Sequence, residues 1–442
     1  MTIQMDKGAA ELLDTLHRAG YAAYVVGGCV RDSLLGLTPH DWDLCTSALP
    51  QQGMELFGEE KCIPTGLQHG TVTVKQGGGL YEITTFRTEG AYTDGRHPDE
   101  VHFVPDVRED LARRDFTINA MAYNAKEGLI DPFGGQADLQ SGILRAVGVP
   151  HQRFTEDALR ILRLYRFAAR FGFAIDPPTA QAAQELCAHL DCVSVERIEE
   201  ELAKLLSAPA PAAYLDEKIL SVVLPELSPE ALAAAKPVVD ACPAGEQALP
   251  VRLAALLLSL GEDGTRRTLR RLRCSNACIE ETAVLVREVV SGVPGAFSSD
   301  TNRAIPSPAL LPAATGSHPS GRSSEKLPAR PQVSLNIYTR KLLGQYGLKT
   351  VQRLAALGTA LQPEHAADFA ALSELAERLD ADGVCCRVSQ LAVNGRDLMA
   401  AGVPAGPGIR KVLEALLDGV IREEYSNERQ ALLTAVQQLA AS

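Results

Sequence analysis

The stretch from Tyr24 to Thr46 constrains this chain more than any other. It opens on an apolar run that ends at two adjacent glycines, Gly27 and Gly28. An apolar run that stops at two glycines predicts a β-strand that breaks into a tight turn, where the backbone can approach a ligand closely because no Cβ atoms intervene. A triphosphate fits such a turn, although a Gly-Gly pair is also compatible with a plain turn.

Two carboxylates follow the turn, at Asp41 and Asp43. Trp42 separates them and Leu44 follows, and we predict that one strand carries all four residues. Because side chains alternate between the two faces of a strand, both carboxylates are expected on one face and Trp42 on the other. Paired carboxylates are hard oxygen ligands for Mg²⁺ and favour phosphoryl-transfer chemistry, whereas the alternative is a solvated strand face.

A third carboxylate belongs to a later part of the expected sheet. The runs Thr71–Val74 and Leu80–Phe86 flank glycines 77–79, which predicts two strands joined by a turn. Glu82 lies within the second of these strands. On a neighbouring strand it would complete a two-metal clamp with the Asp pair, but a lone strand glutamate is usually only exposed.

The segment 113–119 reads Arg-Arg-Asp-Phe-Thr-Ile-Asn. Together with the Gly-Gly turn and the Asp pair, it resembles the nucleotidyltransferase superfamily, and specifically the family of bacterial tRNA CCA-adding enzymes and poly(A) polymerases. The resemblance implies that Arg114 holds phosphate. It also implies that Asp115 with Asn119 recognises or supports the sugar.

Helical spacing governs the chain from Phe154 onward. One polar stripe is formed by Asp157, Arg160, Arg163, Arg166 and Arg170. These positions recur every three or four residues and are expected to share a helix face, while Leu159, Leu162 and Phe167 face elsewhere. A solvated face would normally mix lysine and glutamate, so an all-arginine stripe predicts a face that contacts an anion.

The first two members of this stripe suggest how bases are selected without a nucleic-acid template. Asp157 only accepts hydrogen bonds and Arg160 only donates them, and at a spacing of three residues both can meet one base edge. Cytosine and adenine offer an amino donor beside an acceptor nitrogen, whereas uracil and guanine offer the reverse and are rejected. The family assigns this role to the same Glu-Asp-x-x-Arg pattern, which implies that Arg163 and Arg166 hold base or phosphate.

Length, charge and hydropathy exclude several classes of protein. The chain has 442 residues, 46% of them hydrophobic, which is ample for roughly two to four packed units. Its net charge of −12 argues against nonspecific coating of nucleic acid but leaves room for a local basic groove. We find no signal segment and no apolar run that could span a bilayer, and we expect a cytoplasmic protein without membrane contact.

We expect an α+β fold with a small mixed α/β nucleotidyltransferase head, residues 1–150, followed by all-α parts. The α-helical parts are a neck at 151–206, a body at 207–292 and a tail at 335–442 that binds tRNA by resemblance. Residues 293–334 are rich in Ser, Pro, Gly and Arg, which predicts a disordered insertion.

Residues 88–99 are polar and rich in turn formers, which predicts a mobile loop. In the family that the chain resembles, a loop at this position assists the switch to adding A. The resemblance further implies that Gly28 and Arg31 cradle the triphosphate, and that CMP and then AMP pass from CTP and ATP to the tRNA 3′ end with Mg²⁺. A poly(A) polymerase, an enzyme adding only CC or only A, and an inactive RNA-binding module remain as alternatives.

Overall fold

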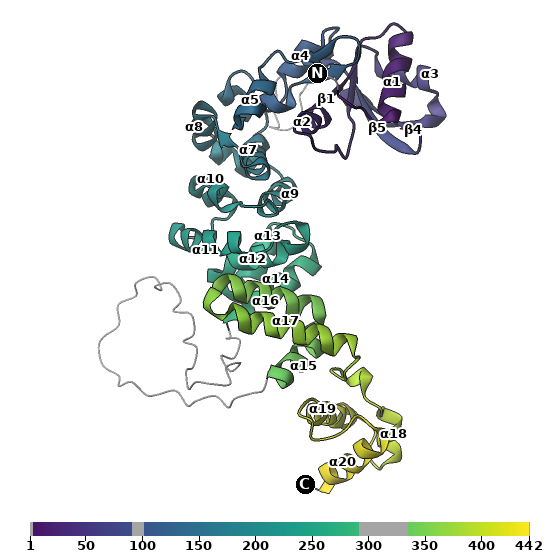
Figure 1. The fold of residues 1–442 in the computed structure, drawn as a ribbon, viewed down its shortest axis with the longest axis vertical. Helices are drawn as coiled ribbons and strands as arrows, with labels where there is room; N and C mark the ends of the chain where they lie inside the picture. The colour runs from purple at the N-terminus through teal and green to yellow at the C-terminus, as the bar shows by residue number, and fades with distance from the viewer. Residues whose placement is uncertain (1–2, 91–100, 291–334, 442) are drawn as a thin grey trace, which may run out of the picture. The chain divides into compact units, whose positions relative to one another are not determined.

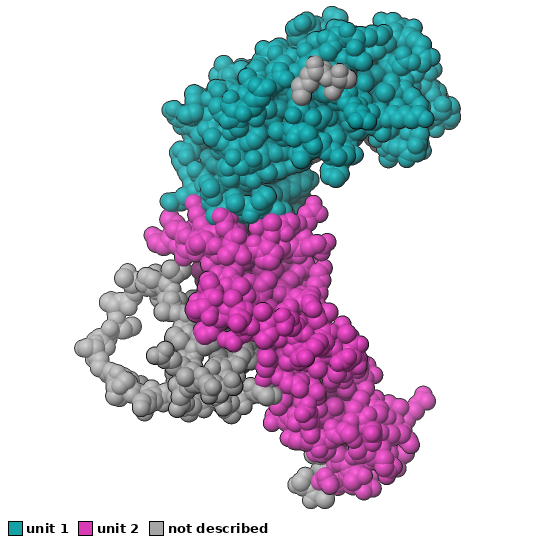
Figure 2. Space-filling view, in the orientation of Figure 1, with its two compact units in different colours: residues 1–225 teal, residues 226–442 magenta. Residues whose placement is uncertain are grey.

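The computed structural model describes residues 3–90, 101–290 and 335–441. Contacts divide the chain into two compact units, residues 1–225 and 226–442 (Figure 2). The predicted insertion at 293–334 and most of the predicted loop at 88–99 lie outside the described residues. Within the part of the chain that is described, no helix is both long and apolar enough to cross a membrane.

A mixed sheet forms the centre of the first unit. Its strands are β1 (Ala23–Val26), β2 (Leu44–Thr46), β3 (Cys62–Gly66), β4 (Thr71–Gln76), β5 (Gly79–Thr85), β8 (Ala122–Asn124) and β9 (Gly128–Ile130). They follow the order β3-β4-β5-β2-β1-β8-β9, in which β2 and β5 are parallel and all other neighbours are antiparallel. The predicted pair of strands around glycines 77–79 is confirmed as β4 and β5.

Helices α1 (Lys7–Arg18) and α3 (Pro50–Phe57) pack against this sheet and against each other (Figure 1). Leu12, Leu13 and Leu16 of α1 are buried, because their spacing places them on the face that meets the sheet. The side chain of Asp6 caps the start of α1 by accepting hydrogen bonds from the first backbone N–H groups. Helix α1 is therefore amphipathic, with one face buried against the sheet.

The rest of the first unit is mainly helical. Its further elements are α2 (Gly28–Leu34), β6 (Arg87–Glu89), β7 (Val101–Phe103), α4 (Val107–Ala112), α5 (Gly135–Ser141), β10 (Ile143–Leu144), α6 (Pro150–Glu156), α7 (Leu159–Phe171), β11 (Ala174–Ile175), α8 (Pro177–Glu185), α9 (Val195–Leu206) and α10 (Glu217–Val223). Strands β6 and β7 pair antiparallel, so Thr88 and Glu89 belong to a strand. The prediction that a loop begins at residue 88 is wrong at these two positions, because cross-strand pairing orders their backbone.

The described part of the second unit is α-helical. Its helices are α11 (Pro229–Ala241), α12 (Leu249–Leu257), α13 (Gly261–Arg271), α14 (Asn276–Val290), α15 (Leu335–Tyr346), α16 (Leu348–Leu361), α17 (Ala366–Ala381), α18 (Gly395–Ala400), α19 (Pro407–Ile421) and α20 (Arg429–Ala441). Helices α16 and α17 lie side by side (Figure 1). A sheet unit followed by helices confirms the predicted α+β class, whereas the finer division into head, neck, body and tail stays a prediction.

Candidate active site

Strand β1 leads directly into the predicted glycine turn. All four residues of β1 are buried, and Gly27 has a φ of 78°, a conformation that glycine adopts at little cost. The Gly27 N–H donates a hydrogen bond to the Met121 carbonyl at 3.1 Å, and α2 begins at Gly28. The strand-to-turn prediction is confirmed, and Gly27 is the residue that needs the special backbone conformation.

Replacing Gly27 with alanine should displace Arg114, because the added Cβ would lie 2.9 Å from its Nη1 atom. Gly36 offers a matched control, since its φ is 74° and a Cβ there would meet no atom within 4 Å. We expect both variants to lose about 1–2 kcal/mol of unfolding free energy through backbone strain. Only Gly27→Ala should weaken nucleotide binding in titrations, and equal nucleotide affinity in the two variants would contradict this close approach.

Arg114 lies beside the glycine turn with unused hydrogen-bonding capacity. Its Nη2 atom is 3.4 Å from Asp110, a long contact for a hydrogen bond. Its buried Nε has no hydrogen-bond partner among the described residues. A buried guanidinium N–H without a partner is costly, and an anionic ligand at this point would satisfy it.

Asp41 and Asp43 precede β2 and do not lie within it as predicted. Strand β2 begins at Leu44, although the Asp43 carbonyl still accepts a hydrogen bond from the Val26 N–H at 3.0 Å. The ladder stops there because β1 turns away at Gly27 immediately afterwards. Neither carboxylate forms an ion pair with any residue that the structure describes.

The parallel pairing of β2 with β5 brings Glu82 alongside the Asp pair. Leu44 pairs with Ile83, so the preceding residues Asp43 and Glu82 are neighbours at the same end of the two strands. Burial raises the pKa of Asp43, the charge of Arg114 opposes this rise, and the charges of Glu82 and Asp41 add to it. Negative charge therefore accumulates here, although no group of three His, Cys, Asp or Glu side chains among the described residues has the geometry to hold a metal ion.

Arg31 is buried and is held by the protein itself. Its side chain donates through Nε to Asp32 at 2.8 Å and through Nη1 to the Asn119 Oδ1 atom at 2.6 Å. Its guanidinium carbon lies 5.2 Å from the ring centre of Phe167 and 5.0 Å from that of Phe171. The resemblance implies that Arg31 contacts a triphosphate, and these protein contacts fix the position of its guanidinium.

Asp115 and Asn119 continue this network. The Asn119 Nδ2 atom donates to Asp115 Oδ1 at 3.0 Å, and Arg163 donates to Asp115 Oδ2 through Nε at 2.9 Å and Nη2 at 2.6 Å. Arg163 also approaches Glu201 of α9, at 3.8 Å, and Glu201 accepts a hydrogen bond from Arg166. Polar contacts therefore run without a break from α2 to α9.

This network should make folding stability depend on pH through Asp115. Burial opposes ionisation, but the charge of Arg163 and the hydrogen bonds from Asn119 and Arg163 outweigh it and lower the pKa of Asp115 from 3.8 to about 2. Because the folded-state pKa lies below the unfolded-state pKa, the ionised carboxylate stabilises the fold above about pH 4, and this contribution is lost as the pH falls through about 2. The shift corresponds to about 2 kcal/mol.

Unfolding free energies of the wild type and Asp115→Asn between about pH 7 and pH 3 test this. Between these two pH values, the difference in unfolding free energy between the wild type and Asp115→Asn should decrease by about half of the stabilisation that ionised Asp115 provides. A gap that stays constant with pH would contradict the lowered pKa.

Asp157 lies at the break between α6 and α7. Its carboxylate accepts a hydrogen bond from the Leu159 N–H at 3.1 Å, and Arg197 of α9 donates to both carboxylate oxygens, at 3.3 and 2.8 Å. Asp157 is thereby fixed in orientation by a second helix.

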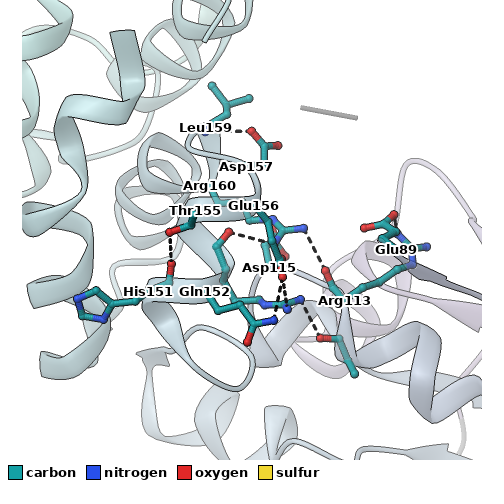
Figure 3. Close-up of polar contacts among 12 residues, drawn as sticks. Glu89, Arg113, Asp115, His151, Gln152, Thr155, Glu156, Asp157, Leu159 and Arg160 are labelled. Atoms are coloured by element: carbon teal, nitrogen blue, oxygen red, sulfur yellow. Dashed lines mark hydrogen bonds and ion pairs between the residues drawn. The ribbon is translucent and has the colours of Figure 1, made fainter. Parts of the chain in front are cut away.

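Arg160 begins the arginine stripe and also contacts the head (Figure 3). It donates to the Arg153 and Arg113 carbonyls, each at 3.1 Å, and to the Glu156 carboxylate at 2.7 Å. Arg113 is in turn bound to Glu89 at 2.9 Å. These described contacts use three of the five guanidinium N–H groups of Arg160.

The arginine stripe contacts carboxylates of the protein. The pairs are Arg160 with Glu156, Arg163 with Asp115, Arg166 with Glu201 and Arg170 with Asp32. The stripe thus faces anions, which are side chains from α2, α6, α9 and the segment after α4. The expectation that Phe167 faces away from the stripe is wrong, because its ring lies against the guanidinium of Arg166 at 3.7 Å.

Glu201 and the aromatic face of α7 were not predicted from the sequence. Glu201 lies in a run of three consecutive glutamates, and only its burial distinguishes it from its neighbours. Phe167 and Phe171 stand four residues apart on the arginine-rich helix and stack with an interplanar angle of 5°. That spacing beside arginines was the available signal for cation–π contacts.

Three family models match separate parts of the chain. The Poly A polymerase head domain matches residues 23–145, which contain the glycine turn, the Asp pair and Arg114. A model for the RNA and SrmB-binding site of polymerase A matches residues 172–230. A model for tRNA nucleotidyltransferase domain 2 matches residues 334–436.

Relatives match over nearly the whole chain. The CCA-adding enzyme of Lactiplantibacillus plantarum is 35% identical, over 99% of this chain and 97% of its own length. The CCA-adding enzyme of Geobacillus thermodenitrificans is 35% identical, over 96% of this chain and 95% of its own. Among solved structures, the Bacillus stearothermophilus CCA-adding enzyme in complex with CTP has a TM-score of 0.77 and 31% identity, and the match covers 99% of this chain and 98% of that one. This chain belongs to the family of bacterial CCA-adding enzymes, nucleotidyltransferases with a poly(A) polymerase head.

Proposed function

We propose that this chain adds CCA to the 3′ end of tRNA, taking CMP from CTP and AMP from ATP. The observation that carries the proposal is that the Gly27 turn, Arg114 and the carboxylates of Asp41 and Asp43 meet where β1 ends and β2 begins, at one end of these central strands. In each cycle the RNA 3′ hydroxyl oxygen bonds to the nucleotide α-phosphorus, the bond to pyrophosphate breaks, and the hydroxyl proton passes to solvent. Full-length similarity to CCA-adding enzymes supports this activity.

We propose Asp41 and Asp43 as the ligands of Mg²⁺. Both lack ion-pair partners among the described residues. Burial raises the pKa of Asp43, and the charges of Glu82 and Asp41 add to that rise. Mg²⁺ is usually held by one or two carboxylates together with substrate phosphates, so two protein ligands fit this ion. When bound, Mg²⁺ would polarise the α-phosphate and lower the pKa of the attacking hydroxyl. Glu82 lies next to Asp43 in the sheet and remains a candidate third ligand.

Arg114 is the residue that we propose binds the triphosphate beside Gly28. It has a buried donor without a partner and lies against the turn, whereas Arg31 is occupied by Asp32 and Asn119. Arg31 would act on the triphosphate by holding α2 and its turn in place. This arrangement explains why a buried arginine directly follows the turn.

The sugar and base contacts remain proposals for residues that now bind one another. Asp115 and Asn119 would support the ribose, and Arg163 and Arg166 would hold base or phosphate. Asp115 and Glu201 already accept hydrogen bonds from Arg163 and Arg166. A nucleotide that binds these arginines would therefore share them with the two carboxylates or displace the carboxylates.

Asp157 and Arg160 are proposed to select the base. The described contacts of Arg160 leave two of its N–H groups unused. The carboxylate of Asp157 has about four lone-pair positions, and the described donors use three of them. One acceptor position and two donor groups are enough for the amino group and ring nitrogen of cytosine or adenine. Uracil and guanine would place like groups opposite each other.

The activity is tested with tRNA transcripts that end at the discriminator base, at C or at CC. Each is incubated with one labelled nucleotide or with CTP and ATP together, plus Mg²⁺, and products are resolved by length. Growth by C, C and A followed by a stop supports CCA addition. Growth by CC alone, by A only on the CC transcript, or by a long A tail would replace the proposal with a narrower activity, and no growth would favour an RNA-binding module.

A further inference from the structure

One aromatic ring lies among three arginines of the candidate site. The ring centre of Phe167 is 5.2 Å from the guanidinium carbon of Arg31, 5.3 Å from that of Arg163 and 3.7 Å from that of Arg166. Phe167 is only 4% exposed. A cation within about 6 Å of an aromatic ring centre is attracted by the ring's negative face, and most strongly where water is excluded.

These arginines come from different parts of the first unit. Arg31 is in α2, directly after the glycine turn, whereas Arg163 and Arg166 are in α7. Three guanidinium groups around one ring repel each other. Each is partly neutralised by its own carboxylate, and the ring is the group that all three contact.

Moving any of these arginines would disturb the groups that surround the nucleotide. Arg31 is hydrogen-bonded to Asn119, and Asn119 and Arg163 both donate to Asp115. The position of the Phe167 ring therefore bears on the start of α2 and on the residues proposed to support the sugar.

A purely structural role is the competing explanation. Phe167 also meets Phe116 edge-on, at an interplanar angle of 80°, and stacks on Phe171 at 5°. Such contacts stabilise any aromatic core. A core role requires the ring's size and shape, whereas a cation–π role also requires the negative charge on its face.

We propose that Phe167 is a positioning residue for nucleotide binding, whose ring face holds Arg31, Arg163 and Arg166 in place. It acts through these arginines and does not itself touch the substrate. The inference rests on the proposed function, because it assumes that the arginines surround a nucleotide.

The test separates ring charge from ring size. Phenylalanine carrying one, two or three ring fluorines is incorporated at position 167, which weakens the negative face in steps with little change in volume. Phe173, which is half-buried, is the control ring, because its centre lies 5.5 Å from that of Phe171 and no guanidinium lies over it among the described residues. CTP affinity is measured by calorimetry on the full chain without tRNA, and thermal unfolding is measured in parallel.

The expected result is a stepwise loss of CTP affinity at position 167, reaching about fivefold with three fluorines, and a flat series at position 173. Melting temperatures should fall by only about a few degrees at position 167, so that the chain stays folded in the binding measurement, and should stay level at position 173. A flat series at position 167, or the same slope at both positions, overturns the inference. Chain that binds CTP with the expected slope but does not extend tRNA would instead refute the proposed function alone.

Discussion

Asparagine in place of Asp43 should lower the incorporation of CMP and of AMP alike by about 1000-fold or more. The amide keeps the size of the side chain but removes the charge of a proposed metal ligand, which both nucleotides would share. Single-turnover extension of tRNA at saturating nucleotide measures the effect. Binding of tRNA without nucleotide, measured by filter retention, should be unchanged.

Glu82→Gln is the control for this substitution, because it removes a neighbouring negative charge from β5. If Glu82 contributes only its negative charge to the local electrostatic field, Glu82→Gln should lower the rate of nucleotide incorporation by less than about tenfold. A loss as large as that of Asp43→Asn would make Glu82 a third ligand. Chelation of divalent ions should abolish wild-type activity, and substantial turnover by Asp43→Asn at ordinary Mg²⁺ would exclude Asp43 from the metal site.

Alanine in place of Arg160 should reduce discrimination against UTP by about 100-fold. The donor that meets the base acceptor nitrogen would be gone, so uracil would no longer place an N–H opposite another N–H. Competition between CTP and UTP on a transcript that ends at the discriminator base gives the ratio directly. The rate with CTP alone should fall less than the ratio does.

Arg160 also binds groups of the protein, which calls for two controls. Glu156→Gln weakens the contact that orients Arg160 without removing its donors, and Arg170→Ala removes another stripe arginine, the partner of Asp32. Glu156→Gln should cause an intermediate loss of discrimination and Arg170→Ala none. Equal discrimination in Arg160→Ala and the wild type would place base selection on other residues.

Local patterns predicted the elements of this fold well. The apolar run before Gly27 forms β1, and the two runs around glycines 77–79 form β4 and β5, because such patterns depend on neighbours in the sequence. The prediction that a strand carries Asp41 and Asp43 is wrong, because β2 begins one residue after Asp43, at Leu44. Where β2 begins is decided by where β1 turns away, and that is a property of two segments together.

The sequence patterns indicated candidate site residues, but they did not indicate which of these residues contact one another. The spacing of Arg163 and Arg166 placed them on one helix face, yet their carboxylate partners, Asp115 and Glu201, lie far away in the sequence. Ion pairs between residues so far apart in the sequence cannot be predicted from the periodicity of a single helix. Phe167 was assigned to an apolar face because hydrophobicity, and not ring charge, was the criterion.

The parallel pairing of β2 with β5 has a consequence for the order of folding. Leu44 pairs with Ile83, and α3, β3 and β4 lie between them in the chain, so the entropy of closing a long loop opposes this contact. Strands β4 and β5, in contrast, form a hairpin with a short turn. The hairpin should therefore form first and dock onto β2 afterwards. A nascent chain that contains Asp41 and Asp43 but not yet β5 lacks Glu82, the third carboxylate of the site. We therefore expect catalytic activity to appear only after β5 has paired with β2.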